Sequence, residues 1–419
     1  MHIQTPSAET PKPSEISGSG RDQRLAGRLL VLDTIRREKE IARIDIARAT
    51  GISPATVTAI TNELLTAGLI ERIQSDTRSG ASRRGRPREA LRIAARARLI
   101  AGLKVATHVI AVLIVDFEGT EIGHYEMPLG ATQHSPEDLC DLIVLAVHRA
   151  ADSCNLRSDE ISGICVGLAG QIDGGRGFVH WSSALYERDV HLGALLAERT
   201  NCPIFIENDA NVVAKAEQIF GQGQLIDNFI VVLLESGIGM GIVINGQLYR
   251  GVRGCSGEIG HTKVSLGGPL CQCGQRGCLE AHAAEYALLA AANAEGRRAF
   301  ADFDSFVTAA QQGDDVARPL LEQAERYFCS TLANIVNVFD PQLIILATPN
   351  AARHPLCSRK VIDGIKELVV AVDTPDPLIS VHGWGPMMWA KGAAAFGIDQ
   401  ISVLSLRDLG KTEAVGTGG

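Results

Sequence analysis

Residues 257–280 read GEIGHTKVSLGGPLCQCGQRGCLE and place one His, three Cys and two Glu within 24 positions. Three thiolates and one imidazole are the donor set that a four-coordinate zinc ion prefers. A full set of four protein ligands leaves no position for water, which is typical of a structural zinc site. The predicted zinc ligands are His261, Cys271, Cys273 and Cys278. The alternative is a glycine-rich loop that carries four unrelated residues.

The predicted zinc loop, residues 258–280, has a carboxylate at each end. Glu258 lies three residues before the His ligand, and Glu280 lies two residues after the last Cys ligand. A metal would hold both carboxylates at a defined separation, and rigid carboxylate oxygens accept hydrogen bonds from the hydroxyls of a polyhydroxylated ligand. The alternative is that both are solvated loop charges.

Length and composition indicate a folded, cytoplasmic protein of two or three domains. The chain has 419 residues, of which 46% are hydrophobic. No apolar run approaches the ~20 residues that a membrane span needs, and the N-terminus lacks a basic-then-apolar secretion signal. Three of the ten cysteines lie in the zinc loop, and the other seven are scattered along the chain. This distribution favours reduced thiols over a disulfide framework.

Charge is distributed unevenly along the chain. Residues 21–100 carry 17 Lys and Arg against 9 Asp and Glu, whereas the remainder carries 23 against 39. A basic N-terminal module on an acidic body predicts that the small part meets a polyanion and that the body has another role.

Residues 1–20 are rich in Pro, Ser, Thr and Gly and are expected to be disordered. Residues 21–97 predict a winged helix-turn-helix, because three helical segments with apolar stripes are followed by a strand and a basic hairpin. The second helix is expected at about 43–49 and ends at Gly51. Ser53 and Pro54 then supply an N-cap and a first-turn proline for a third helix that reaches about Ala67.

The third helix is predicted to bury Val57, Ile60 and Leu64 and to turn small polar residues outward, which would let it enter a major groove. In the following wing, an Arg between Gly85 and Pro87 is suited to a narrow minor groove. The predicted contacts to double-stranded DNA are Ser53, Ala55, Thr56, Thr58, Asn62, Arg84 and Arg86, within a wing that also carries Arg83 and Arg88. The alternative is a dimerisation or scaffold module with an ordinary solvated face.

From Leu99 the pattern is α/β. Residues 99–122 and 228–252 each read as paired strands joined by a turn, with a helical region between them. Two such hairpins predict an internally duplicated, two-lobed protein whose halves enclose a ligand cleft.

Between the hairpins, a strand over 161–168 runs into a glycine turn, and a strand ending near Ile206 leads through Glu207 and Asn208 to Asp209. A carboxylate at the start of a helix is stabilised by unpaired amides. Asp209 is therefore either a capping residue, the commoner case, or a base and acceptor for a ligand hydroxyl.

These features together resemble the ROK family of sugar kinases and sugar-responsive transcriptional repressors. The resemblance covers Leu25 to about Ile398 and is carried by GEIGH, CQCGQRGCLE and ENDAN. It implies an α/β, two-lobed, actin-like ATPase (ribonuclease H-like) domain over 98–405, and the preceding winged helix-turn-helix is similar to that of the repressor branch. The lobes are expected at about 98–215 with a C-terminal helix 386–400, and at about 216–385, with a flexible tail over 406–419.

The same resemblance implies a zinc ion on the four loop ligands and a sugar in the cleft. In the family's kinases, the residue that matches Asp209 is the catalytic base. The implied sugar-binding residues are Asn208, Asp209, Glu258, His261 and Glu280.

The phosphate-binding loops depart from the kinase pattern. At the first hairpin, the kinase motif Asp-x-Gly-Gly-Thr has lost its acid, its glycines and its hydroxyl, and its positions hold Lys104, Ala106, Thr107 and His108. A later Gly-Gly pair of the kinases is replaced by Ala347 and Thr348. In the second loop, Glu235 adds a negative charge beside the expected anion. Phosphoryl transfer depends on cradling phosphates, so these changes predict loss of kinase activity.

The sequence therefore predicts a non-enzymatic repressor of carbohydrate uptake or catabolism genes, controlled by a small-molecule sugar effector. A two-fold operator requires a homodimer or a homotetramer. The alternatives are an ATP-dependent sugar kinase with a fused DNA-binding domain and a DNA-binding regulator that responds to a protein partner.

Overall fold

A computed structural model describes residues 20–74, 89–294, 299–349, 351–373, 375–383, 385 and 387–416. The chain divides into two compact units: residues 98–399 form the body, and residues 1–97 with 400–419 form the N-terminal unit. The segment expected to be disordered lies outside the described residues except for Gly20. None of the helices in the described part of the chain is long and apolar enough to cross a membrane.

The N-terminal unit is a winged helix-turn-helix, as predicted. Its sheet has the order β1-β3-β2 with antiparallel pairing. Gly51 ends the second helix with a φ of 70°, and the Ser53 side chain accepts from the Thr56 N–H at 3.2 Å to begin the third. Its elements are α1 (Gly20–Glu38), β1 (Ile41–Ala42), α2 (Arg43–Thr50), α3 (Pro54–Thr66), β2 (Ile70–Gln74) and β3 (Glu89–Ile93).

The C-terminal helix differs from the prediction. Instead of ending near 400 and giving way to a tail from 406, α12 spans Met388–Gly416. The reason lies in its contacts with α1: Arg28 donates to the Leu406 carbonyl at 3.5 Å, and Arg36 donates to the Ser402 hydroxyl at 3.2 Å. Both α12 residues are fully or almost fully buried, so the segment has tertiary packing that its own composition does not reveal.

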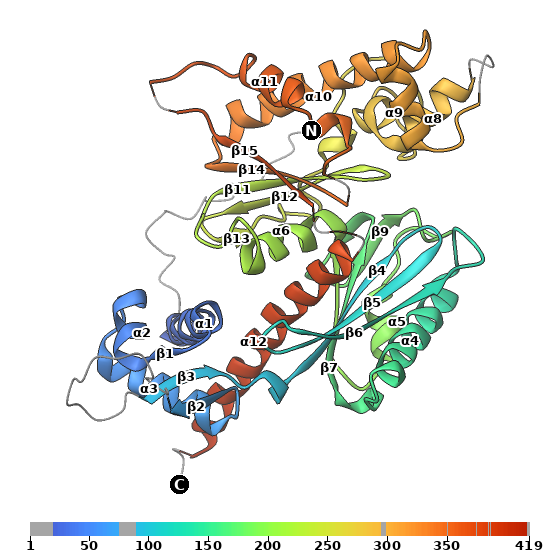
Figure 1. Ribbon diagram of the computed structural model, residues 1–419. Helices are drawn as coiled ribbons and strands as arrows, with labels where there is room; N and C mark the ends of the chain where they lie inside the picture. Colours follow the sequence, from blue (N-terminus) through green and yellow to red (C-terminus); the bar gives the residue numbers. More distant parts are fainter. Residues whose placement is uncertain are drawn as a thin grey trace, which may run out of the picture. The chain divides into compact units, whose positions relative to one another are not determined.

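The body contains two five-stranded sheets, which Figure 1 shows with their covering helices. The first sheet has the order β10-β7-β4-β5-β6, in which β4, β5 and β6 are antiparallel and β7 and β10 run parallel to β4. Its elements, with the helix α4 that packs on it, are β4 (Leu99–Val105), β5 (Val109–Asp116), β6 (Glu121–Pro128), α4 (Pro136–Ser153), β7 (Ile161–Leu168) and β10 (Ile204–Asn208).

The second sheet repeats this plan. Its order is β13-β12-β11-β14-β15, with β11, β12 and β13 antiparallel and β14 and β15 parallel to β11. Each sheet thus starts from a hairpin and adds two parallel strands on the other side, which confirms the predicted two-lobed, internally duplicated fold. The strands are β11 (Phe229–Leu234), β12 (Ile238–Ile244), β13 (Gln247–Leu248), β14 (Leu343–Thr348) and β15 (Leu378–Gly383).

The remaining body elements complete the two lobes. A small hairpin and a short helix belong to the first lobe: β8 (Gly170–Asp173), β9 (Phe178–Ser182) and α5 (Leu192–Ala197). Helices that share the main core of the second lobe are α7 (Glu280–Ala283), α8 (Glu285–Ala294), α9 (Phe303–Gln311), α10 (Ala317–Phe339) and α11 (Arg359–Lys366).

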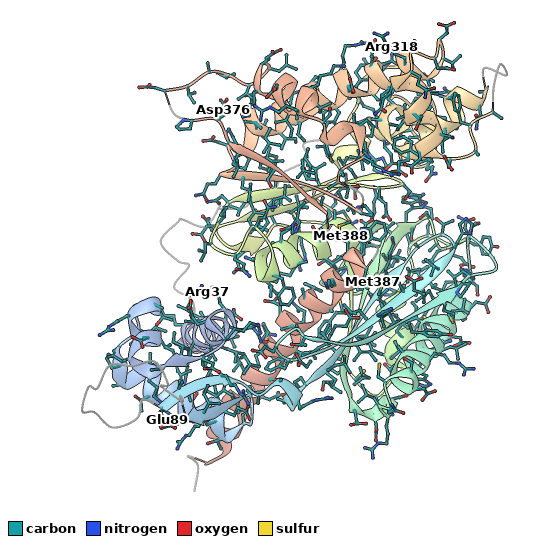
Figure 2. The ribbon with its side chains drawn as sticks, viewed as in Figure 1. Arg37, Glu89, Arg318, Asp376, Met387 and Met388 are labelled. Carbon is teal, nitrogen blue, oxygen red and sulfur yellow. The ribbon has the colours of Figure 1, made fainter. Side chains whose placement is uncertain are left out.

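Two helices, α6 (Asp209–Phe220) and α12, join the cores of the two lobes. Side chains of α6 and of the start of α12 pack on the second sheet, while Val212 and Phe396 from these helices pack on Cys165 of the first. Met388, which is labelled in Figure 2 and begins α12, is almost fully buried, with 1% of its surface exposed. The helix approaches β4 so closely that a Cβ on Gly102 would lie 2.2 Å from the Ala394 nitrogen, so only glycine fits there.

Candidate functional site

A cavity of about 600 Å³ lies within the body and is lined by residues of both lobes. Its volume is in the range of about 300–1,000 Å³ that is typical of ligand pockets. All five residues that the sequence analysis predicted to contact a sugar line this cavity: Asn208, Asp209, Glu258, His261 and Glu280. Segments separated by more than 40 residues therefore meet at one site.

The β10–α6 junction assigns the helix cap to Asn208. Its side-chain oxygen accepts from the N–H groups of Ala210 at 2.9 Å and Asn211 at 3.3 Å, and its amide donates to the Gly170 carbonyl at 3.0 Å. Asn208 is thus the N-cap, and Asp209 is the first helical residue. The commoner alternative for Asp209, a capping role, is therefore wrong, and its carboxyl lines the cavity while accepting from Ala210.

Crowded carboxyls control the electrostatics of the cavity. Burial raises the pKa of Asp209 to about 7, and the charges of Glu235 and Glu280 add to this rise, whereas the Ala210 N–H and Lys104 oppose it. Burial also raises the pKa of Glu258 to about 7, with Asp209 and Glu280 as neighbouring charges. Near neutral pH such a carboxyl can both donate to and accept from hydroxyls, which suits a neutral polyol better than an anion.

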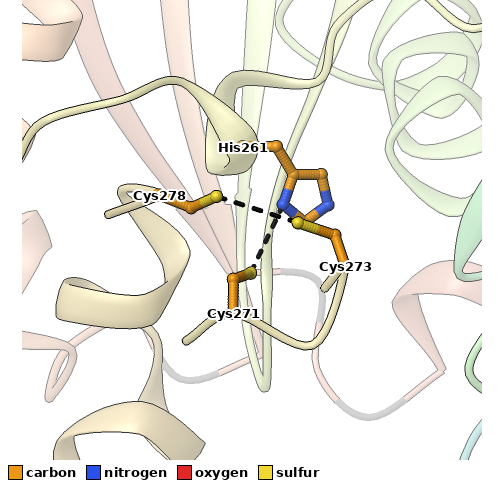
Figure 3. A group of neighbouring side chains, drawn as sticks. All are labelled: His261, Cys271, Cys273 and Cys278. Carbon is orange, nitrogen blue, oxygen red and sulfur yellow. Dashed lines mark hydrogen bonds between the residues drawn. The ribbon is translucent and has the colours of Figure 1, made fainter. Parts of the chain in front are cut away.

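The predicted metal ligands converge in space (Figure 3). One donor atom from each of His261, Cys271, Cys273 and Cys278 lies within 4.8 Å of the others. The Cys273 and Cys278 sulfurs are 3.8 Å apart, and the Cys271 sulfur is 3.6 Å from His261 Nδ1. A tetrahedral ion with metal–sulfur bonds of about 2.3 Å requires a sulfur–sulfur separation of roughly 3.8 Å, so these four residues fit one metal ion.

Contacts around this cluster connect it to the cavity. His261 turns Nδ1 toward Cys271, while its Nε2 lies 3.6 Å from a Glu258 oxygen. Glu280 accepts from the Tyr286 hydroxyl at 3.2 Å and from the Ile238 N–H at 3.3 Å. Such outer contacts orient the ligands of a metal and, here, also fix the two carboxylates that face the cavity.

Lys263 provides a further contact that the sequence analysis missed. Its ammonium lies 3.0 Å from the Cys278 sulfur and donates to the His261 carbonyl at 2.9 Å. A cation at this position offsets the negative charge that three thiolates would carry. The sequence could have indicated this contact, because Lys263 lies within the zinc loop, two residues after His261.

Two residues of the loops that the sequence analysis compared with phosphate-binding loops form an ion pair. Lys104 on β4 lies 2.8 Å from Glu235, at the end of β11, and its ammonium is 3.5 Å above the centre of the Trp389 ring. The negative charge expected from Glu235 is therefore balanced. Thr107 lines the cavity from the turn between β4 and β5 with Ala106 and His108 beside it, and Ala347 and Thr348 are buried at the end of β14.

Two glycines of the second loop lie at close contacts. A Cβ on Gly237 would lie 2.9 Å from a Glu280 oxygen, and one on Gly239 would lie 3.0 Å from the Ala210 side chain. Close approach of a carboxylate and a helix accounts for both glycines. The cavity also includes Trp181, Tyr286 and Trp389, which no local sequence pattern had indicated.

The third helix of the N-terminal unit has the predicted faces. Val57, Ile60 and Leu64 are buried. The residues proposed for DNA contact that are described are all exposed: Ser53, Ala55, Thr56, Thr58 and Asn62. Arg84 and Arg86, with Arg83 and Arg88, lie outside the described residues. Ser53 and Thr56 also share a hydroxyl contact of 2.8 Å at the helix start, so both have a local structural role.

Comparison with known proteins agrees with both parts of the fold. The model of the ROK family matches residues 100–384, and that of the MarR family matches residues 26–79. The chain is 30% identical over 384 residues to the xylose repressor of Bacillus spizizenii, covering 91% of this chain and 96% of that protein. It is also 30% identical over 319 residues to the DNA-binding transcriptional dual regulator NagC of Escherichia coli, covering 73% and 76% of the two chains.

Solved structures show the same architecture. A ROK family transcriptional regulator described as a homologue of the E. coli MLC protein covers 92% of this chain and 99% of its own, with a TM-score of 0.76 and 23% identity. The ROK hexokinase from Thermus thermophilus covers 72% of this chain and 99% of its own, with a TM-score of 0.61 and 29% identity. With a family model that spans more than half of its length and an N-terminal winged helix, this chain belongs to the ROK family.

Proposed function

We propose that this protein is a transcriptional repressor of carbohydrate uptake or catabolism genes whose binding to DNA is controlled by a sugar. The observation that carries the proposal is the cavity in which Asn208, Asp209, Glu258, His261 and Glu280 meet, in a chain that begins with a winged helix-turn-helix. Relatives named xylose repressor and N-acetylglucosamine repressor support the class of function. The α3 helix reads the operator, and the body binds the effector.

The metal proposed for the cluster is zinc. One imidazole and three thiolates whose donor atoms lie within 4.8 Å of one another suit this ion, and four protein ligands leave no open position for catalysis. Zinc would hold the loop that carries Glu258 and Glu280 and would have a structural role only.

In this proposal, the protein is a sensor without kinase activity. The relatives reported above are named a repressor and a transcriptional dual regulator, and the Lys104–Glu235 pair occupies the first two phosphate loops with side chains. Backbone amides that would cradle phosphate cannot be approached closely where such side chains lie. Two features favour the kinase alternative: Asp209, which matches the catalytic base of the family's kinases, and the fold shared with a ROK hexokinase. Binding and turnover of nucleotide therefore have to be measured as well.

The effector of this proposal is a neutral sugar. Carboxyls of Asp209, Glu258 and Glu280 surround the predicted sugar position and would repel an anion. Reading a two-fold operator requires at least a homodimer, and a homotetramer is the other arrangement proposed.

Thermal unfolding with a sugar panel tests this function. Xylose, glucose and N-acetylglucosamine are the first candidates, and a sugar at 100 times its dissociation constant is expected to add roughly 2.7 kcal/mol of stability. Asp209→Asn should lower the affinity for that sugar by about 10- to 100-fold, because a hydrogen bond to a charged group contributes roughly 1.5–3 kcal/mol. The matched control is Asp152→Asn on the exposed side of α4, which should leave the shift unchanged.

Nucleotide provides the contrasting outcome. Mg-ATP should neither shift the melting temperature nor yield a phosphorylated sugar. Turnover of ATP that disappears in Asp209→Asn would instead establish the kinase alternative.

A further inference from the structure

Residues 249–257, which we call the strap, connect the end of β13 to Glu258 of the sugar cavity. Two hydrogen bonds close the strap on itself. The Ser256 N–H donates to the Arg250 carbonyl at 3.0 Å, and the Ser256 hydroxyl donates to the Tyr249 carbonyl at 2.6 Å. Because this closure lies two residues before Glu258, the position of Arg250 influences the position of that carboxyl.

A buried ion pair attaches the strap to the first lobe. Arg250 Nε lies 2.7 Å from Oε2 of Glu207, a residue of β10 whose side chain has no exposed surface. The other oxygen of Glu207 accepts from the Asn208 N–H at 3.0 Å and from the side-chain amide of Asn211 at 2.9 Å. One carboxylate therefore contacts both the strap and the β10–α6 junction, which carries two of the predicted sugar contacts.

Open space borders the rest of the strap. A second cavity, of about 430 Å³, is lined by first-lobe residues together with Arg253 and Cys255 of the strap and with Glu258. The strap backbone approaches the first lobe at Gly254, where a Cβ would lie 2.8 Å from the Cα of Asp173. The open space reduces the packing around this part of the strap, so the charged contact at Arg250 gains importance for the position of Glu258.

The proposed zinc ion does not replace this contact. A metal would fix Glu258 relative to Glu280, because both belong to the loop that carries the ligands. Asn208 and Asp209 reach the same cavity from the β10–α6 junction, outside the zinc loop. A sugar that bonds to both groups needs a fixed separation between them, because hydrogen bonds require donor–acceptor distances of about 2.5–3.2 Å.

We infer that Arg250 is a positioning residue of the sugar site. Through its ion pair with Glu207, it holds the carboxyl of Glu258 at a fixed separation from the β10–α6 junction. This inference rests on the proposed function, because it concerns the same cavity. Among the residues that the structure describes, neither Arg250 nor Glu207 lines that cavity, so both act through the residues that they hold. Loss of the pair lowers the fraction of molecules arranged to bind sugar, and the apparent affinity falls in proportion.

Arg250→Met tests this role, because it removes the charge and the hydrogen bond but keeps an unbranched side chain. The full chain is titrated calorimetrically with xylose, glucose and N-acetylglucosamine. The sugar that the wild type binds should bind at least about tenfold more weakly to Arg250→Met. Arg250→Lys keeps the charge on a flexible stem and should stay within about threefold of the wild type. The matched control is Arg253→Met, at an exposed position of the same strap, which should change the affinity less than about twofold.

Stability has to be measured separately from affinity. Arg250→Met leaves the buried charge of Glu207 without its partner and should lower the melting temperature. The double variant Glu207→Gln with Arg250→Met removes that charge, and its amide oxygen can still accept hydrogen bonds at the β10–α6 junction. We expect the double variant to melt closer to the wild type than Arg250→Met does, but to bind sugar at least about tenfold more weakly than the wild type.

The outcomes separate this inference from the proposed function. Wild-type sugar affinity in the folded double variant would show that the pair only stabilises the fold, and would overturn the inference while leaving the sugar sensor intact. Equal losses of affinity in Arg250→Met and Arg253→Met would overturn it as well. Absence of carbohydrate binding by the wild type would overturn both the inference and the proposed function.

Discussion

Replacement of Cys278 by serine is expected to remove the metal and, with it, carbohydrate binding. Cys278 is fully buried, and its sulfur lies 3.8 Å from that of Cys273 in the four-residue cluster. Serine is a poor ligand for zinc, and loss of one of four ligands releases the loop that the ion organises. The metal content should fall from about one ion per chain to below about 0.1, as measured by mass spectrometry of the purified protein.

The effect on the sugar follows from the contacts between cluster and cavity. Glu280 lies two residues after Cys278, and Glu258 lies beside His261. Without the metal, the two carboxylates lose their fixed separation, so sugar affinity should fall by at least about 100-fold. This loss is larger than the loss expected from removal of one residue that contacts a metal ligand. Cys140→Ser is the matched control, because this thiol is equally buried but lies in α4, away from the cluster. A Cys278→Ser protein that keeps both metal and sugar affinity would show that the four residues are not a metal site.

Addition of negative charge to the first turns of α3 is expected to abolish operator binding. Ala55 and Thr58 are exposed on this helix, and the buried face is formed by other residues, so Ala55→Glu with Thr58→Glu should leave the fold intact. Carboxylates placed against the phosphate-rich groove repel it, and juxtaposed like charges cost several kcal/mol. Operator affinity should fall by at least about 100-fold in a fluorescence anisotropy titration.

Thr66→Glu provides the control for this pair. It adds the same charge at the last residue of the same helix, away from the N-terminal turns that contact bases in helix-turn-helix proteins. Its operator affinity should change less than about threefold. Equal losses in both proteins would indicate a general charge effect, and unchanged binding in the double variant would assign DNA recognition to another surface.

The sequence predicted the metal cluster and the duplicated lobes because their signals are local. Four ligands lie within 18 positions, from His261 to Cys278, and each lobe begins with its own apolar hairpin. The third DNA-module helix was predictable for the same reason, since Ser53 and Pro54 directly precede its first turn.

Other features depend on contacts between distant segments. Lys104 and Glu235 are 131 positions apart, and neither residue type indicates the other, so the sequence analysis did not predict this ion pair. The cap at the start of α6 belongs to Asn208 because the helix begins one residue earlier than a cap at Asp209 would require. Helix α12 continues past 406 because Ser402 and Leu406 contact α1, at residues that lie 366 and 378 positions earlier in the chain.

A sugar in the cavity is expected to change the affinity of the protein for its operator. A ligand can shift an equilibrium only through different affinities for two states, and couplings of this kind typically amount to about 5- to 150-fold. The most direct measurement is operator affinity with and without the sugar that stabilises the protein, in the wild type and in Asp209→Asn. We expect a change of at least about fivefold in the wild type and little or none in Asp209→Asn, whose affinity without sugar should match the wild type. Unchanged operator affinity in the wild type, under conditions where the sugar is bound, would show that the sugar does not control DNA binding.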